Sequence, residues 1–203
     1  MSTATLRVTP GTPAEIGRVN TAITWLLGTA TGGPPPNLFT TLARHRRLFR
    51  PWLRFAGGLM PGGTLPRDES ELVILRVAHL TGCAYEWHHH ERLGARAGLA
   101  AEEIARVRDG AQAPGWTPRR KLLLGAVDEL HRDGRIGDEL WGRLSAQWSD
   151  TELIEICLLT GHYIMLAMTI NSLGIQLDPV PDPQARRSPA ARLIQAIAAR
   201  RGA

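Results

Sequence analysis

Apolar residues recur along most of the chain at the three- and four-residue spacing of amphipathic helices, and no segment shows the convincing alternation of a β-strand. The pattern predicts an all-α fold, a bundle of helices separated by proline, glycine and capping residues. The predicted helices span about residues 12–27, 37–47, 51–57, 69–80, 83–98, 100–107, 117–131, 138–147, 149–173 and 189–200.

Local start signals support several of these helices. Thr117 precedes Pro118, which combines a capping side chain with a proline at the first helical position. Ser149 and Glu152 have the spacing of a capping box, in which each side chain satisfies a backbone amide near the other. The longest predicted helix begins there.

Two predicted helices, residues 69–80 and 154–170, are apolar on nearly all sides. Such a helix has to be buried all round. Either it lies at the centre of one subunit, or a subunit interface covers its last face and the protein is a homo-oligomer. The sequence leaves both alternatives open.

The chain divides into three segments by composition. We expect an N-terminal helix with a Pro/Gly linker in residues 1–36, a helical domain in 37–178 and a basic tail in 179–203. From position 183 onward the tail has five arginines and no acid, and we interpret it as a solvated end. An acidic partner or nucleic acid is the alternative, and we expect no nucleic-acid binding.

Composition excludes several classes of protein. We find no apolar run of about 18 residues and no signal peptide, so the expected location is cytoplasmic, without a membrane. A single lysine, Lys121, excludes nearly all Schiff-base chemistry. No glycine-rich phosphate loop follows a strand, so we expect no nucleotide and no other cofactor. The two cysteines, Cys83 and Cys157, form no Cys-x-x-Cys motif.

Most of the candidate chemistry lies between positions 71 and 90. Cys83, Glu86 and His90 are three and seven residues apart and share one helix face. Cys83 follows Gly82 in the first turn, where free backbone amides favour a thiolate. Glu86 and His90, four residues apart, have the spacing for a hydrogen bond that orients the imidazole. Together they suggest a proton relay, although each has an ordinary structural explanation as well.

Glu71 is the fourth candidate, because it interrupts an otherwise apolar helix. A carboxylate is rarely buried without a partner or a task. The structural alternative is an ion pair with Arg67 or Arg76.

The segments 71–76 (ELVILR) and 82–87 (GCAYEW), followed by His90, resemble the signature of the carboxymuconolactone decarboxylase superfamily, which includes the alkylhydroperoxidase D proteins. The resemblance is specific over about residues 69–91 and looser over 37–178. It implies an all-α, alkylhydroperoxidase D-like fold that forms trimers or hexamers. Tyr85, His162 and Tyr163 are further candidates, as residues that line a substrate pocket.

In peroxidase members of this family a glutamate, two cysteines spaced Cys-x-x-Cys and a following histidine form the centre. Glu71, Cys83 and His90 match three of these positions, whereas Glu86 replaces the second cysteine. A two-cysteine peroxidase needs that second thiol to resolve its sulfenic acid. A carboxylate there suits proton transfer better.

These residues lead to three hypotheses about function. The first is a cofactor-free enzyme that uses Glu86, His90, Cys83 and Glu71 for decarboxylation, isomerisation or elimination on a small organic acid, lactone or carbonyl compound. The second is a thiol peroxidase in which Cys83 reacts and an external thiol restores it. The third is a non-catalytic oligomeric scaffold. A zinc-like ion held by Cys83, Glu86 and His90 is conceivable chemically, but the resemblance implies no metal and we expect none.

Overall fold

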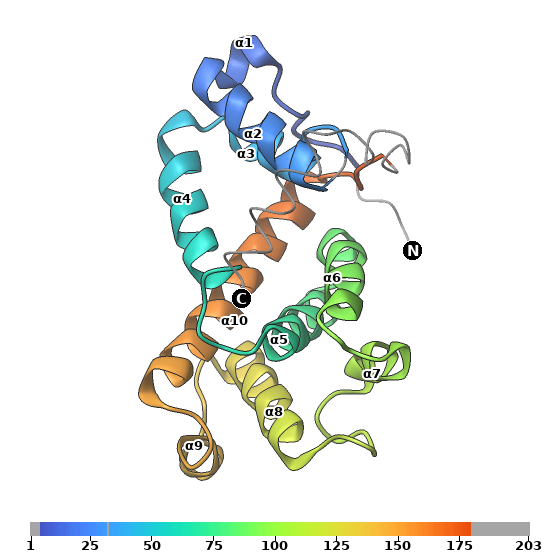
Figure 1. The fold of residues 1–203 in the computed structure, drawn as a ribbon, viewed down its shortest axis with the longest axis vertical. Coiled ribbons are helices and arrows are strands. Elements are labelled where there is room, and N and C mark those ends of the chain that lie inside the picture. The colour runs from blue at the N-terminus through green and yellow to red at the C-terminus, as the bar shows by residue number, and fades with distance from the viewer. Residues whose placement is uncertain (1–4, 32, 180–203) are drawn as a thin grey trace. The chain divides into compact units, whose positions relative to one another are not determined.

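The computed structural model describes residues 5–31 and 33–179, and within these ranges every regular element is a helix (Figure 1). The all-α prediction is therefore confirmed. The predicted helix over 189–200 lies outside the described residues. The elements are α1 (Pro13–Ile16), α2 (Arg18–Thr31), α3 (Asn37–Leu42), α4 (Arg46–Leu59), α5 (Arg67–Leu80), α6 (Ala84–Arg96), α7 (Ala101–Arg106), the 3₁₀ helix η1 (Val107–Asp109), α8 (Pro118–Asp133), α9 (Asp138–Ser145) and α10 (Asp150–Leu173).

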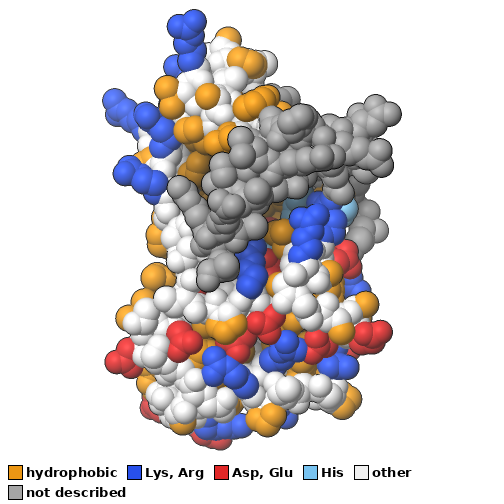
Figure 2. Space-filling view, viewed as in Figure 1, with side chains coloured by type: hydrophobic (Ala, Val, Ile, Leu, Met, Phe, Trp, Pro, Cys, Tyr) orange, Lys and Arg blue, Asp and Glu red, His pale blue; other side chains and the backbone are white. Residues whose placement is uncertain are grey.

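The described residues form two compact units, one within residues 5–58 and 172–179 and the other over residues 59–171. The expected boundaries at 36 and 178 stay predictions. In the first unit, Ile16, Ala43 and Phe49 form a small buried core. Residues 1–58 contain seven arginines and one glutamate. On the face drawn in Figure 2, Lys and Arg side chains gather near the N-terminal helices without Asp or Glu beside them.

The predicted start signals act as expected. The hydroxyl of Thr117 accepts a hydrogen bond from the backbone amide of Arg120 at the start of α8. Ser149 and Glu152 form the capping box before α10, with the Ser149 amide donating to Glu152 Oε2 at 2.8 Å. Cys83 is the N-cap residue of α6. These predicted helix starts are confirmed. The sequence indicates them well because the capping residues act on backbone groups only a few positions away.

The N-terminal region differs from the prediction. The expected helix over 12–27 is broken at Gly17, whose φ of 79° lies in the left-handed region. There the guanidinium of Arg46 donates to the carbonyls of Ala14 and Glu15, the last turn of α1, and so satisfies groups that a longer helix would have paired internally.

The second difference concerns residues 37–57. The expected helix over 37–47 ends at Leu42, and the expected short helix over 51–57 is the end of the longer α4, which contains Pro51. A proline inside a helix removes one hydrogen bond. Phe49 on α4 is 1% exposed and packs with Trp52 and Leu53. Tertiary packing of this face offsets the loss.

Helix α10 is long and apolar enough to span a membrane by length and composition alone, so the expectation that no segment reaches this length is wrong. Of its most apolar window, 56% is buried inside the protein. The buried core helix of a globular protein passes the same test.

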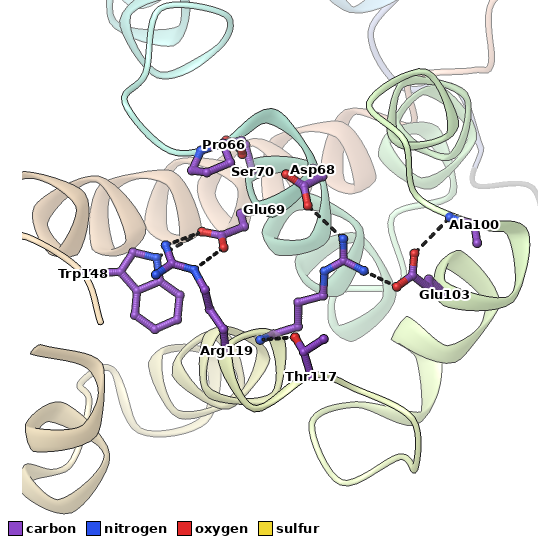
Figure 3. Close-up of polar contacts among 10 residues, drawn as sticks. Pro66, Asp68, Glu69, Ser70, Ala100, Glu103, Thr117, Arg119 and Trp148 are labelled. Atoms are coloured by element: carbon purple, nitrogen blue, oxygen red, sulfur yellow. Dashed lines mark hydrogen bonds and ion pairs between the residues drawn. The ribbon is translucent and has the colours of Figure 1, made fainter. Parts of the chain in front are cut away.

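Helix α5 is buried from Glu69 to Ala78 and packs against α6, α8 and η1. It nevertheless brings carboxylates inside, and each has a cationic partner. Glu69 accepts from Arg119 at 2.5 and 3.1 Å and from the Trp148 indole at 3.0 Å, while Arg119 stacks on the Trp148 ring (Figure 3). The neighbouring Asp68 pairs with the guanidinium of Arg120, which also pairs with Glu103.

Replacing Arg119 with alanine is expected to lower the free energy of unfolding by about 2 kcal/mol, because the nearly buried Glu69 loses its charged partner. Arg120→Ala is the matched control, since the carboxylates of Asp68 and Glu103 are 31% and 23% exposed and water can solvate them. Its expected cost is about 1 kcal/mol or less. Urea unfolding measures both, and an equal or greater loss in Arg120→Ala would contradict this account.

Candidate active site

The candidate site begins at the joint between α5 and α6. Gly82 adopts a φ of 62°, which reverses the chain after α5 at a position that disfavours other residues. Cys83 follows as the N-cap residue, with its amide bonded to the carbonyl of Ala78 at 2.8 Å. The backbone amides of Tyr85 and Glu86 approach the sulfur and act to lower the pKa of the thiol. The expected helix-start environment is therefore present.

Burial outweighs that effect at Cys83. The residue is completely buried, and desolvation, together with the charge of Glu86, raises the pKa of its thiol to about 12. The expectation that this position favours a thiolate is therefore wrong. At neutral pH Cys83 is a neutral thiol.

Glu86 is the most unusual group of the site. It is 2% exposed, and neither carboxyl oxygen accepts a hydrogen bond from an N–H or O–H group of the described residues. Desolvation raises its pKa to about 8, while the neighbouring Cys83 thiol acts in the opposite direction. Most Glu86 side chains are consequently protonated at neutral pH, and Glu86 is an acid that can give up a proton.

Glu71 and His90 form the second polar pair. Glu71 is completely buried on α5, and its Oε2 accepts a hydrogen bond from His90 Nδ1 at 2.7 Å. Its Oε1 lies 2.8 Å from a guanidinium nitrogen of Arg67. The Nδ1–H bond leaves the lone pair of a neutral imidazole on Nε2. His90 is thereby oriented as a base.

This pairing corrects one expectation and decides another. The expected hydrogen bond between Glu86 and His90 is not formed, because His90 bonds Glu71 across the α5–α6 contact instead. Of the two arginines considered for Glu71, Arg67 pairs with it, whereas Arg76 pairs with Asp128.

Helix α10 contributes two aromatic residues to the same group. The ring of Tyr163 lies 5.2 Å from that of His90 at 89°, and His162 lies edge-on to Tyr163 at 5.3 Å. Burial is the largest cause of a raised pKa at Tyr163, and the charges of Glu71 and Glu86 raise this pKa further. Tyr163 therefore lies near both carboxyl groups. Burial lowers the pKa of His162 to about 4, which keeps it neutral.

The other sequence candidates are placed differently. Tyr85 is 5% exposed, and its ring contacts that of His89 at 4.5 Å, so its role in a pocket stays a prediction. Both Cys83 and Cys157 are free thiols. Within the part of the chain that the structure describes, no group of three or more His, Cys, Asp or Glu side chains is arranged to hold a metal ion.

Comparison with known proteins agrees with this geometry. Residues 46–129, which include Glu71, Cys83, Glu86 and His90, match the carboxymuconolactone decarboxylase family. The resemblance seen in the sequence is thus confirmed over residues 46–129, which match the model of that family. No curated protein matches the chain.

Solved structures show the same fold. One is described as the core of the alkylhydroperoxidase AhpD, a peroxidase-related protein from Ralstonia eutropha JMP134, with 17% identity, a TM-score of 0.72 and coverage of 88% of this chain and 94% of its own. A peroxidase-related protein from Silicibacter sp. TM1040 has 13% identity, a TM-score of 0.72 and coverage of 93% and 98%. The debrominase Bmp8 has 13% identity, a TM-score of 0.70 and coverage of 93% and 96%.

The raised pKa of Glu86 predicts a pH dependence of stability. Between its ordinary value of 4.5 and the value of about 8 in the fold, the unfolded chain has released this proton and the folded protein has not. Stability therefore falls as the pH rises through this window, by at most about 1.4 kcal/mol per pH unit from this group.

Glu86→Gln removes this contribution, so its free energy of unfolding should rise relative to the native protein from pH 5 to about pH 8. Urea titrations at several pH values measure the difference. The exposed Glu102→Gln is the control and should show no such trend. If the free energy of unfolding changed with pH in the same way in Glu86→Gln and in the native protein, the raised pKa of Glu86 would be contradicted.

Proposed function

We propose that the protein is an enzyme that performs cofactor-free acid–base chemistry on a small organic acid, lactone or carbonyl compound, by decarboxylation, isomerisation or elimination. The observation behind this proposal is Glu86, a buried carboxylic acid with a pKa of about 8 that stands where peroxidases of the family have a second cysteine. A group with such a pKa is suited to donate a proton near neutral pH.

In this proposal Glu86 is the general acid. Its proton goes to the oxygen of a substrate carbonyl or lactone as negative charge develops there. The carboxylate left behind is buried, and the Cys83 thiol beside it acts to stabilise the anion, because its hydrogen bond lowers the pKa of Glu86. Cys83 thus assists as a hydrogen-bond donor.

His90 is the general base. Its Nδ1–H is held by Glu71, so Nε2 accepts the proton from the substrate carbon. In an isomerisation the C–H bond breaks toward Nε2 while the O–H bond forms with the proton of Glu86. Arg67 pairs with Glu71, and Glu71 stabilises the imidazolium that forms. Tyr163 and His162, beside His90, are the proposed substrate wall.

A thiol peroxidase that uses Cys83 is the second candidate. The backbone amides near the sulfur and the AhpD-like solved structures favour it. The debrominase Bmp8 has also been solved as a cysteine-to-alanine variant in complex with 2,3,4-tribromopyrrole. Against it stands the pKa of about 12 at Cys83, since the thiolate is the reactive form.

The two candidates differ in the residue they require. With a panel of small lactones and keto acids in D₂O, NMR measures proton exchange and product formation. Glu86→Gln should lower the rate by about 10²- to 10⁴-fold. Cys83→Ser, which keeps a hydrogen-bond donor, should stay within about tenfold of the native rate.

The same variants test the peroxidase. The native protein, given a peroxide without added thiol, should form no sulfenic acid at Cys83 that a dimedone probe traps faster than at Cys157. Peroxide consumption is measured separately, with dithiothreitol as the reductant. Rapid trapping at Cys83, with full peroxide consumption in Glu86→Gln, would overturn the acid–base proposal.

A further inference from the structure

Three arginines occupy one face of α4, in the first compact unit. Arg47, Arg50 and Arg54 are spaced three and four residues apart, which places their side chains in one row about 5–6 Å apart at Cβ. All three are exposed. Like charges at this spacing repel one another, and this repulsion destabilises the helix.

Nothing in the described structure compensates these charges. Elsewhere in the same unit Arg44 pairs with Glu15, and Arg46 donates to the carbonyls of Ala14 and Glu15. By contrast, no described residue forms a hydrogen bond or ion pair with Arg47, Arg50 or Arg54. Helix α4 itself contains no acid. Among the described residues, the row is thus a local excess of positive charge that no acidic side chain neutralises.

The arginines also line an open groove. Its volume is about 660 Å³, and among the described residues Arg47, Arg50 and Arg54 line it together with the apolar side chains of Ile23, Pro51 and Leu53. Clefts of roughly 300–1,000 Å³ are typical of small-molecule sites. A smaller cavity of about 180 Å³ adjoins Arg50 and is lined as well by Arg18 and Arg46.

We propose that this groove binds a small organic anion that has at least two negative charges and an apolar body. Guanidinium groups bind phosphate or carboxylate oxygens through paired hydrogen bonds, and three in a row suit two acidic groups or one doubly charged group. The apolar walls bury the remainder of the ligand. Binding relieves the repulsion along α4 and is independent of the acid–base site on α5 and α6.

Three probes separate charge from apolar contact. 1-Naphthyl phosphate has both, inorganic phosphate has the charge alone, and 1-naphthol has the apolar body alone. Calorimetric titration of the full chain at low salt should give one site for 1-naphthyl phosphate. Its affinity should be at least about tenfold higher than that of either other probe, and it should fall with added salt.

Substitution then locates the site. The triple variant R47Q/R50Q/R54Q and the single variant Arg50→Gln should each weaken 1-naphthyl phosphate binding, the triple by at least about tenfold. Removing the repulsion should leave the melting temperature of the triple variant unchanged or higher. The control R135Q/R143Q removes two exposed arginines of the second unit and should bind as the native protein does.

Equal binding of inorganic phosphate and 1-naphthyl phosphate, or equal losses in the control, would overturn the proposal and show a non-specific charge effect. Unchanged binding in Arg50→Gln, which should fold normally at an exposed position, would overturn it as well.

Discussion

The arrangement depends on one constraint: a carboxylate that the buried helix α5 brings into the interior must find a partner there. Burying an ionised group without one costs several kcal/mol. The structure meets this constraint with Arg119 and Trp148 for Glu69, and with Arg67 and His90 for Glu71. These pairs join α5 to α6 and α8 and to the segment before α10. The same requirement that stabilises the fold therefore orients His90.

Glu86 responds to the same constraint by a different route. It has no N–H or O–H donor among the described residues and stays protonated instead, which removes the cost of a buried charge. Cys83 beside it likewise remains a neutral thiol. Two neutral acids next to the hydrogen-bonded Glu71–His90 pair are an arrangement for moving protons, whereas a dithiol centre requires a thiolate. The difference arises from burial and from a single replaced side chain.

The sequence predicted the features that depend on near neighbours. The joint at Gly82 and Cys83, the caps at Thr117 and Ser149 and the burial of α5 all have local signals. It did not predict the break at Gly17, because an arginine 29 positions away along the chain caps the preceding turn. Nor did it predict the Glu71–His90 bond, since helical spacing reports only neighbours on one helix. The need of Glu71 for a partner was the available signal. The protonation of Glu86 depends on packing by other helices, which spacing does not reveal.

The central claim is that Glu86 is an acid still protonated at neutral pH. The protein labelled with ¹³C at the glutamate side-chain carboxyl gives one NMR signal per residue, and Glu86→Gln assigns the signal that disappears. This signal should titrate with a midpoint of about 8. A midpoint near the ordinary value of 4.5 would show that Glu86 is a carboxylate in the fold, and it would contradict the assignment of Glu86 as the proton donor.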